Sequence, residues 1–208
     1  MKENFVITIG RQLGSGGLLI GEKLASMMNI SFYDKELINI ASKESGLGKE
    51  FFERFDEKDS HSFFGGFLSL RGLHSDDMYS NNYLNNETLF TIQSDIIRNL
   101  AEEKSCVFIG RCADYVLNDH PHCLNVFLSA NMEDKIKRVS EMHNLPENKA
   151  KDFIEKMDKK RASYYNYYSN KMWGVAESYD LCINSSALGI DETVNFICKF
   201  AEKKFGLK

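Results

Sequence analysis

The chain has 208 residues and a formal net charge of −4. At about 150 residues per domain, this length favours one domain, with or without a mobile insert. Hydrophobic residues make up 43% of the chain and there are only two prolines, which excludes collagen-like and proline-rich disordered proteins. The slightly acidic balance and the absence of a long apolar run predict neither a nucleic-acid partner nor a membrane partner.

The cysteines are odd in number, and no two of them have the C-x-x-C spacing of a redox or zinc motif. The apolar run that begins at Phe5 ends at Gly10, which is too short for a signal peptide. We therefore expect reduced thiols, a cytoplasmic location and no zinc site. The five cysteines are Cys106, Cys112, Cys123, Cys182 and Cys198.

Short apolar runs alternate with stretches of helical spacing, an order that is typical of α/β proteins. Most of the runs are continuous, as in parallel strands that are covered on both faces. The predicted strands are Phe5–Ile9, Ile30–Tyr33, Cys106–Ile109, Leu124–Leu128 and Asp180–Ile183. The predicted helices are Leu18–Met28, Glu87–Lys104, Met132–Met142 and Glu192–Phe205. Together they predict a parallel sheet built from βαβ units.

Two segments interrupt this alternation. Residues 45–86 lack a clear period, and a loop of that length is usually functional or disordered. Residues 144–171 are rich first in lysine and then in tyrosine. Clustered aromatic groups pack against a sheet or a partner chain more often than they stack on a base, so we expect packing for most of these tyrosines.

The turn after the first predicted strand contains four glycines in eight residues, from Gly10 to Gly17. Glycine reaches positive φ at low cost and lets backbone N–H groups approach a ligand closely. The start of the following helix adds unpaired N–H donors and the positive end of the helix dipole. The arrangement favours a phosphate cradle over a turn without a ligand. The predicted phosphate-binding residues are Gly10, Arg11, Gly14, Ser15, Gly16 and Gly17.

This turn departs from the Walker A pattern G-x-x-x-x-G-K-[ST]. Gly17 stands where the lysine is expected, and Leu18 follows where a hydroxyl group for Mg²⁺ is expected. Arg11 is the nearest replacement cation, because a guanidinium group can grip a phosphate with two hydrogen bonds. The alternative for Arg11 is a surface arginine that pairs with a carboxylate. At Gly16 we expect any side chain to fill the space that the phosphate needs.

A set of short motifs extends from the first strand to the start of the last helix. They are Ile7–Gly17 with Ile20-Gly21, Phe32–Ile38, Val107–Arg111, Val126–Ala130, Tyr179–Ser185 and Ile190–Glu192. Their order and spacing resemble the cytidylate kinase-like branch of the P-loop nucleoside monophosphate kinases. The resemblance implies a three-layer α/β P-loop NTPase fold with a parallel, roughly five-stranded sheet and a helical lid. It also implies a single domain over residues 1–208, with an acceptor-side insert at 45–86 and a lid-like segment at 141–171.

The same resemblance implies transfer of the γ-phosphoryl group of ATP to CMP or dCMP, with Mg²⁺. By position, Asp34 and Arg111 would bind the acceptor nucleotide, as would Asp158 of the lid's Asp-x-x-Arg element. Cys112 follows Arg111 where the family has an aspartate. The acceptor site is therefore predicted with one family residue missing.

Three arginines are the predicted catalytic residues. Arg138 and Arg161 match arginines that border the lid in the family, and Arg11 lies in the glycine turn. Several cations suit phosphoryl transfer because negative charge spreads over three oxygens of the transferring group. The metal ligands are unassigned, since no clear acidic residue follows the strand that ends at Leu128.

Two other functions fit the same residues. A nucleotide-binding sensor or partner module without kinase activity would account for Gly17 in the lysine position. A kinase of another small metabolite would account for residues 45–86, which occupy the stretch expected to cover the acceptor. The sequence leaves open the acceptor, the replacement for the lysine and the oligomeric state.

Overall fold

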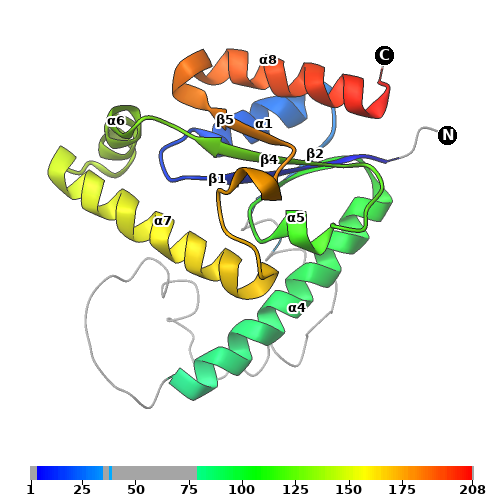
Figure 1. Ribbon diagram of the computed structural model, residues 1–208, viewed down its shortest axis with the longest axis horizontal. Coiled ribbons are helices and arrows are strands. Elements are labelled where there is room, and N and C mark those ends of the chain that lie inside the picture. Colours follow the sequence, from blue (N-terminus) through cyan, green and yellow to red (C-terminus); the bar gives the residue numbers. More distant parts are fainter. Residues whose placement is uncertain (1–3, 35–37, 39–78, 208) are drawn as a thin grey trace. The chain divides into compact units, whose positions relative to one another are not determined.

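The computed structural model describes residues 4–34, 38 and 79–207 (Figure 1). The chain divides into two compact units, one formed by residues 1–35 and 97–208 and the other by residues 36–96. The sheet and every site residue predicted from the sequence belong to the first unit.

Five parallel strands form one sheet in the order β2-β3-β1-β4-β5, which confirms the predicted parallel sheet. The strands are β1 (Val6–Arg11), β2 (Ser31–Tyr33), β3 (Cys106–Ile109), β4 (Cys123–Ser129) and β5 (Leu181–Asn184). The side chains of β1, β3 and β4 are largely buried, which explains why these runs are continuously apolar. Since all strands are parallel, their carboxyl ends meet at one edge, with β1 in the middle.

Helices cover both faces of this sheet. In Figure 1, α1 and α8 lie on one face, while α5 and α7 lie on the other side, which gives the three layers of the predicted α/β fold. None of the helices in the described part of the chain has the length and apolar character needed to span a bilayer. The helices are α1 (Gly17–Met28), α4 (Tyr79–Glu103), α5 (Ala113–Val116), α6 (Met132–His143), α7 (Glu147–Ser169) and α8 (Ser185–Phe205), with a short 3₁₀ turn at Ala176–Ser178.

Helix α4 begins earlier than its spacing predicts, at Tyr79 rather than Glu87. The added turns are rich in asparagine, a weak helix former, so the helical pattern is weak there. These turns lie inside the predicted insert 45–86, and the remainder of that insert lies outside the described residues. Its acceptor-side role stays a prediction.

Helix α8 also begins early, at Ser185 rather than Glu192. Asn184 caps the helix, because its side chain accepts a hydrogen bond from the backbone N–H of Ser186. Gly189 then kinks the helix with a φ of 75°. The kink interrupts the helical periodicity, and for this reason the pattern indicated only the second part.

Two apolar clusters organise the first unit. The larger one fills the space between the sheet and helices α1 and α8, with Ile9 and Ile197 fully buried. The smaller one joins α6 to α7 through Val139 and Ile154, and Leu13 of the glycine turn packs against it. The turn between β1 and α1 is therefore attached to the lid-like segment by apolar packing.

A buried hydrogen bond joins α7 to α5. The hydroxyl group of Tyr165 donates to Oδ2 of Asp114 over 2.6 Å, and both residues are buried. Burial raises the pKa of the Asp114 carboxyl group, although the hydrogen bond from Tyr165 acts in the opposite direction. This pair joins the C-terminal part of α7 to α5.

Replacing Asp114 should change the pH dependence of folding. Because its pKa is raised above the ordinary 3.8, the native state holds this proton more tightly than the unfolded chain does. Its contribution to stability is fully present below pH 3.8 and is lost as the pH rises through the native pKa. Urea unfolding between about pH 4 and about pH 7 should show Asp114→Asn gaining free energy of unfolding relative to the wild type as the pH rises.

The matched control is Asp119→Asn, which changes an exposed carboxylate three residues beyond α5. Its difference from the wild type should vary less with pH. If the difference between Asp114→Asn and the wild type were the same at every pH, the raised pKa of Asp114 would be contradicted.

Candidate active site

The glycine turn lies between β1 and α1, in the middle of the carboxyl edge of the sheet. Gly14 and Gly16 both have a φ of 77°, a left-handed conformation that other residues adopt only with strain. Ser15 is fully buried, and its hydroxyl group donates to the carbonyl oxygen of Gln12 over 2.8 Å. Ser185 at the start of α8 donates to the carbonyl oxygen of Ser15 over 2.7 Å. The turn is thus held in shape from within and from α8.

Five backbone N–H groups of this turn and of the start of α1 have no hydrogen-bond partner among the described residues. They belong to Gly14, Gly16, Gly17, Leu18 and Leu19. The last three lie in the first turn of α1, where a helix offers its N–H groups no internal acceptor. Unpaired N–H groups at a helix start, together with the positive end of the dipole, form an anion-binding nest. This geometry is that of a phosphate cradle.

The side chain of Arg11 explains why residue 17 is glycine. A Cβ atom on Gly17 would lie 2.7 Å from Cβ and 2.8 Å from Cγ of Arg11, so a side chain has no room there. The guanidinium group of Arg11 continues to the end of β3, where Nη1 fills the space that a Cβ atom on Gly110 would need. An arginine from the start of the turn therefore lies against the backbone from which the Walker A lysine would extend.

Three guanidinium groups share this edge of the sheet. The pKa of Arg11 is lowered from 12.5 to about 9, first by burial and then by the positive charges of Arg161 and Arg111. Asp34, at the end of β2, and Asp158 raise the pKa of Arg11, but they do not offset the lowering by burial and by the other two arginines. A buried cation with too little negative charge around it is stabilised when an anion binds. The charge balance therefore favours a phosphate beside Arg11.

The turn after β3 presents Arg111 in a strained backbone conformation. Gly110, Arg111 and Cys112 have consecutive φ values of 72°, 56° and 53°, all left-handed. Residues other than glycine are uncommon in this region, and such strain gathers at functional sites. The guanidinium carbon of Arg111 lies 5.5 Å from the ring centroid of Tyr164 on α7, within cation–π range. The left-handed turn after β3 and the contact with Tyr164 thus position Arg111 at the carboxyl edge of the sheet.

The two arginines predicted from the lid bind carbonyl oxygens of the glycine turn. Nη1 of Arg138 on α6 donates to the carbonyl oxygen of Gly14 over 2.9 Å. Nη1 of Arg161 on α7 donates to the carbonyl oxygen of Arg11 over 3.0 Å. These bonds occupy two carbonyl oxygens of the turn and bring both guanidinium groups beside the cradle. Their catalytic roles stay predictions.

Asp158 and Lys135 form a polar group on the same side of the turn. Oδ1 of Asp158 accepts the backbone N–H of Leu13 over 2.7 Å, while Oδ2 lies 3.6 Å from Nζ of Lys135. Nζ of Lys135 also donates to Oε1 of Gln12 over 3.2 Å. Asp158 was expected near the acceptor, and Lys135 was not among the predicted site residues. The available signal was its position on α6, one helical turn before Arg138.

Gly10 and Gly16 have packing reasons for lacking a side chain. Gly10 belongs to β1, and a Cβ atom on it would lie 3.0 Å from the ring of Phe127. A Cβ atom on Gly16 would collide with the side chain of Ile190 in α8. From the sequence, a side chain at Gly16 was expected to fill the space that the phosphate needs. In the structure its Cβ atom would instead point toward Ile190 of α8, so this reason is wrong.

The described side chains include no cluster of metal ligands. No group of three or more His, Cys, Asp or Glu residues in the described part of the chain is placed to hold a metal ion. Strand β4 ends at Ser129 and is followed by Ala130, neither of which is acidic, and Leu18 offers no ligand atom. Mg²⁺ prefers oxygen ligands, and in nucleotide complexes substrate phosphates supply many of them.

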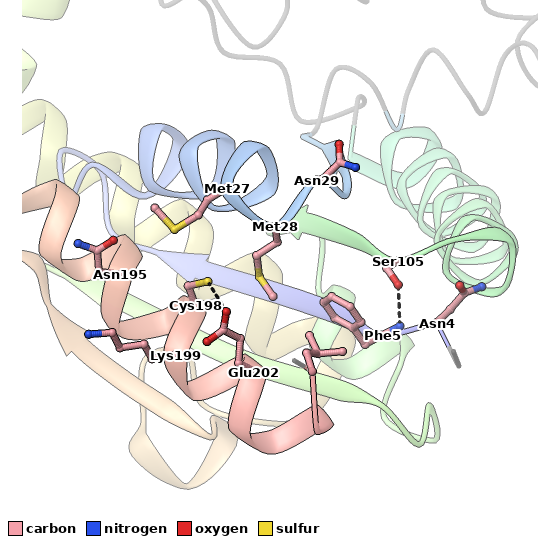
Figure 2. Close-up of a pocket in the computed structure, with 11 residues that line it drawn as sticks. Asn4, Phe5, Met27, Met28, Asn29, Ser105, Asn195, Cys198, Lys199 and Glu202 are labelled. Atoms are coloured by element: carbon pink, nitrogen blue, oxygen red, sulfur yellow. Dashed lines mark hydrogen bonds between the residues drawn. The ribbon is translucent and has the colours of Figure 1, made fainter. Parts of the chain in front are cut away.

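A cavity of about 760 Å³ lies away from the glycine turn, near the amino end of β1 (Figure 2). Its walls include Phe5 before β1, Met28 at the end of α1, and Cys198 and Glu202 of α8. Ligands of open parallel sheets bind at the carboxyl ends of the strands, whereas this cavity lies beside the amino end of β1. It is not part of the candidate active site.

The chain is similar to solved structures over nearly its whole length. An uncharacterized protein from Eubacterium ventriosum is 29% identical with a TM-score of 0.73, and the match covers 96% of this chain and 99% of that chain. A shikimate kinase from Bacteroides thetaiotaomicron is 15% identical with a TM-score of 0.53, covering 95% of this chain and 98% of that chain. A shikimate kinase from Acinetobacter baumannii, in complex with shikimate, has the same identity and TM-score and covers 97% and 95%. The two kinases show the P-loop fold.

No curated protein matches this chain significantly. A family does: residues 6–187 match the cytidylate kinase-like family, a range that includes the glycine turn, the Arg111 turn and helices α6 and α7. Family and fold together indicate a small-molecule kinase. Because the match spans most of its length, the chain belongs to the cytidylate kinase-like family.

Proposed function

We propose that this protein transfers the γ-phosphoryl group of ATP to a nucleoside monophosphate, CMP or dCMP, in the cytoplasm. The observation that carries the proposal is the set of unpartnered N–H groups in the glycine turn, beside the undercompensated charge of Arg11. The cradle suits the triphosphate of the donor. The charge suits the transferring group and the phosphate of the acceptor.

The donor would sit on the glycine turn. The N–H groups of Gly14, Gly16, Gly17 and Leu18 supply neutral donors to phosphate oxygens, and the start of α1 adds a positive dipole end. Because the turn is already closed by hydrogen bonds, little reorganisation is needed when the phosphates bind.

The acceptor would sit beyond Arg11, at the ends of β2 and β3. Arg111 follows β3 and would bind the monophosphate, since a guanidinium group can hold a phosphate with two parallel hydrogen bonds. Asp34 at the end of β2 can accept a hydrogen bond from a cytosine amino group or a ribose hydroxyl group. Residues 45–86 would cover this side, and residues 141–171 would act as the lid.

In the transfer itself, an oxygen of the acceptor phosphate attacks the γ-phosphorus, and the bond from that phosphorus to the bridging oxygen of ADP breaks as ADP leaves. Catalysis of this step depends on positioning and on stabilising the charge of the transferring group. Arg11 lies between the turn and the end of β3, so its guanidinium group is suited to that charge. Arg138 and Arg161 would assist from the lid side.

A coupled assay with ATP, Mg²⁺ and a panel of nucleoside monophosphates tests the substrate class. We expect turnover with CMP and dCMP and less with UMP, because Asp34 accepts hydrogen bonds and cytosine offers the amino donor that uracil lacks. An absence of turnover with every nucleoside monophosphate would defeat the proposal.

Arg11→Lys tests the role of the buried guanidinium group. Lysine keeps the charge but lacks the planar fork, so we expect kcat to fall by about a hundredfold, the usual cost of losing one preorganised donor. Steady-state kinetics and thermal melting measure the effect, and the exposed Arg98→Lys is the matched control. A kcat equal to that of the wild type in a folded Arg11→Lys protein would remove Arg11 from the mechanism.

A second candidate function is a nucleotide-binding module without kinase activity. Gly17 and Leu18 favour it, since the ammonium and hydroxyl groups of the Walker A pattern are missing. Calorimetry that finds ATP binding, combined with an assay that finds no transfer, would select this alternative. A kinase of another small metabolite would appear as turnover confined to acceptors outside the nucleotides.

A further inference from the structure

The proposed kinase lacks an ammonium group in its phosphate turn, and Arg11 leaves no room for one. At Gly17 the nearest atoms of Arg11 are its Cβ and Cγ, and its guanidinium group lies at Gly110 on the acceptor side. The donor side of the turn must therefore take its cation from another element. The structure offers one buried lysine on that side, among the residues it describes.

The backbone of Lys135 is fixed against the turn. A Cβ atom on Gly14 would lie 2.8 Å from the carbonyl oxygen and 2.9 Å from the Cα atom of Lys135, so α6 touches the turn at this residue. Only glycine permits such an approach at a φ of 77°. The side chain of Lys135 thus starts directly beside the first unpartnered N–H group of the cradle.

The ammonium group of Lys135 stays at the turn and does not extend into solvent. The residue is 5% exposed, whereas lysine is rarely buried unless its charge is paired. Its partners are Oε1 of Gln12 at 3.2 Å and Oδ2 of Asp158 at 3.6 Å. One amide oxygen and one carboxylate at ion-pair distance leave this ammonium group able to take a further acceptor.

Asp158 behaves as an anion already bound to the turn. One of its oxygens accepts the N–H of Leu13, next to the unpartnered N–H of Gly14, and the other faces Lys135. Arg161 lies 3.9 Å from the same carboxylate. A backbone N–H, an ammonium group and a guanidinium group around one carboxylate are the contacts that a phosphate oxygen would also seek.

We propose that Lys135 of α6 supplies the ammonium group that the glycine turn lacks, and that it binds the terminal phosphates of the triphosphate in exchange for part of its contact with Asp158. The role is that of a phosphate-binding residue contributed by the lid-like side of the site. The inference rests on the proposed function for its ligand, a nucleoside triphosphate. It predicts a binding effect that can be measured without catalysis.

Calorimetry with ATP and with inorganic tripolyphosphate provides that measurement. Lys135→Met keeps the buried aliphatic chain and removes the charge, so both ligands should bind about tenfold to a hundredfold more weakly. Lys135→Arg should restore most of the affinity, and the exposed Lys137→Met on the same helix is the matched control. Affinity for CMP should not change in any of them, and KM for ATP should rise in Lys135→Met.

Asp158→Asn gives an independent readout of opposite sign. If the carboxylate competes with phosphate for Lys135 and for the N–H of Leu13, its removal should tighten tripolyphosphate binding. This gain should disappear in the double variant with Lys135→Met. Weaker tripolyphosphate binding in Asp158→Asn would contradict the exchange, even if Lys135→Met failed to fold.

The outcomes separate this inference from the proposed function. Unchanged tripolyphosphate affinity in a folded Lys135→Met protein overturns the role of Lys135, whether or not the wild type transfers phosphate. Lysine-dependent tripolyphosphate binding without turnover on any monophosphate upholds the role and defeats the proposed reaction. A wild type that binds neither ATP nor tripolyphosphate overturns both.

Discussion

Three side chains of α6 and α7 hold the backbone of the glycine turn, and the chemistry of the carboxyl edge depends on how they do so. Arg138 and Arg161 donate to two carbonyl oxygens, and Asp158 accepts one N–H group. Two carbonyl oxygens of the turn are thereby occupied from the lid side, while five N–H groups of the turn and of the start of α1 stay without partners among the described residues. A turn with several unpaired N–H donors at the start of a helix is suited to binding an anion.

The positive charge around this turn comes from residues outside the Walker A lysine position. Arg11 lies against Gly17 and reaches the end of β3, so its guanidinium group lies on the proposed acceptor side of the turn. Burial and two neighbouring guanidinium groups make its charge costly until an anion arrives. The positive charge of the site is therefore divided between an arginine on one side of the turn and side chains of α6 and α7 on the other.

The sequence predicted the five strands and the glycine turn, because strand burial and glycine placement are local signals. The roles of Asp34 and Arg111 were predicted only from the resemblance to the family. The sequence could not predict the role of Lys135, because the sequence pattern of an amphipathic helix does not distinguish a buried lysine from an exposed one. Nor could it predict that the N–H of Leu13 binds a carboxylate on α7, because a backbone contact leaves no mark on residue type. Helix α4 was predicted too short for a related reason: its first turns are polar and form weak helical patterns.

The central claim is that backbone N–H groups of the glycine turn bind the phosphates of ATP. Amide NMR spectroscopy of the ¹⁵N-labelled protein tests it most directly, because glycine N–H resonances fall in a distinct region. Titration with ATP should shift the resonances of Gly14, Gly16 and Gly17 and saturate them with one dissociation constant. If those three resonances stay in place while ATP shifts others, the nucleotide binds elsewhere and the claim is contradicted.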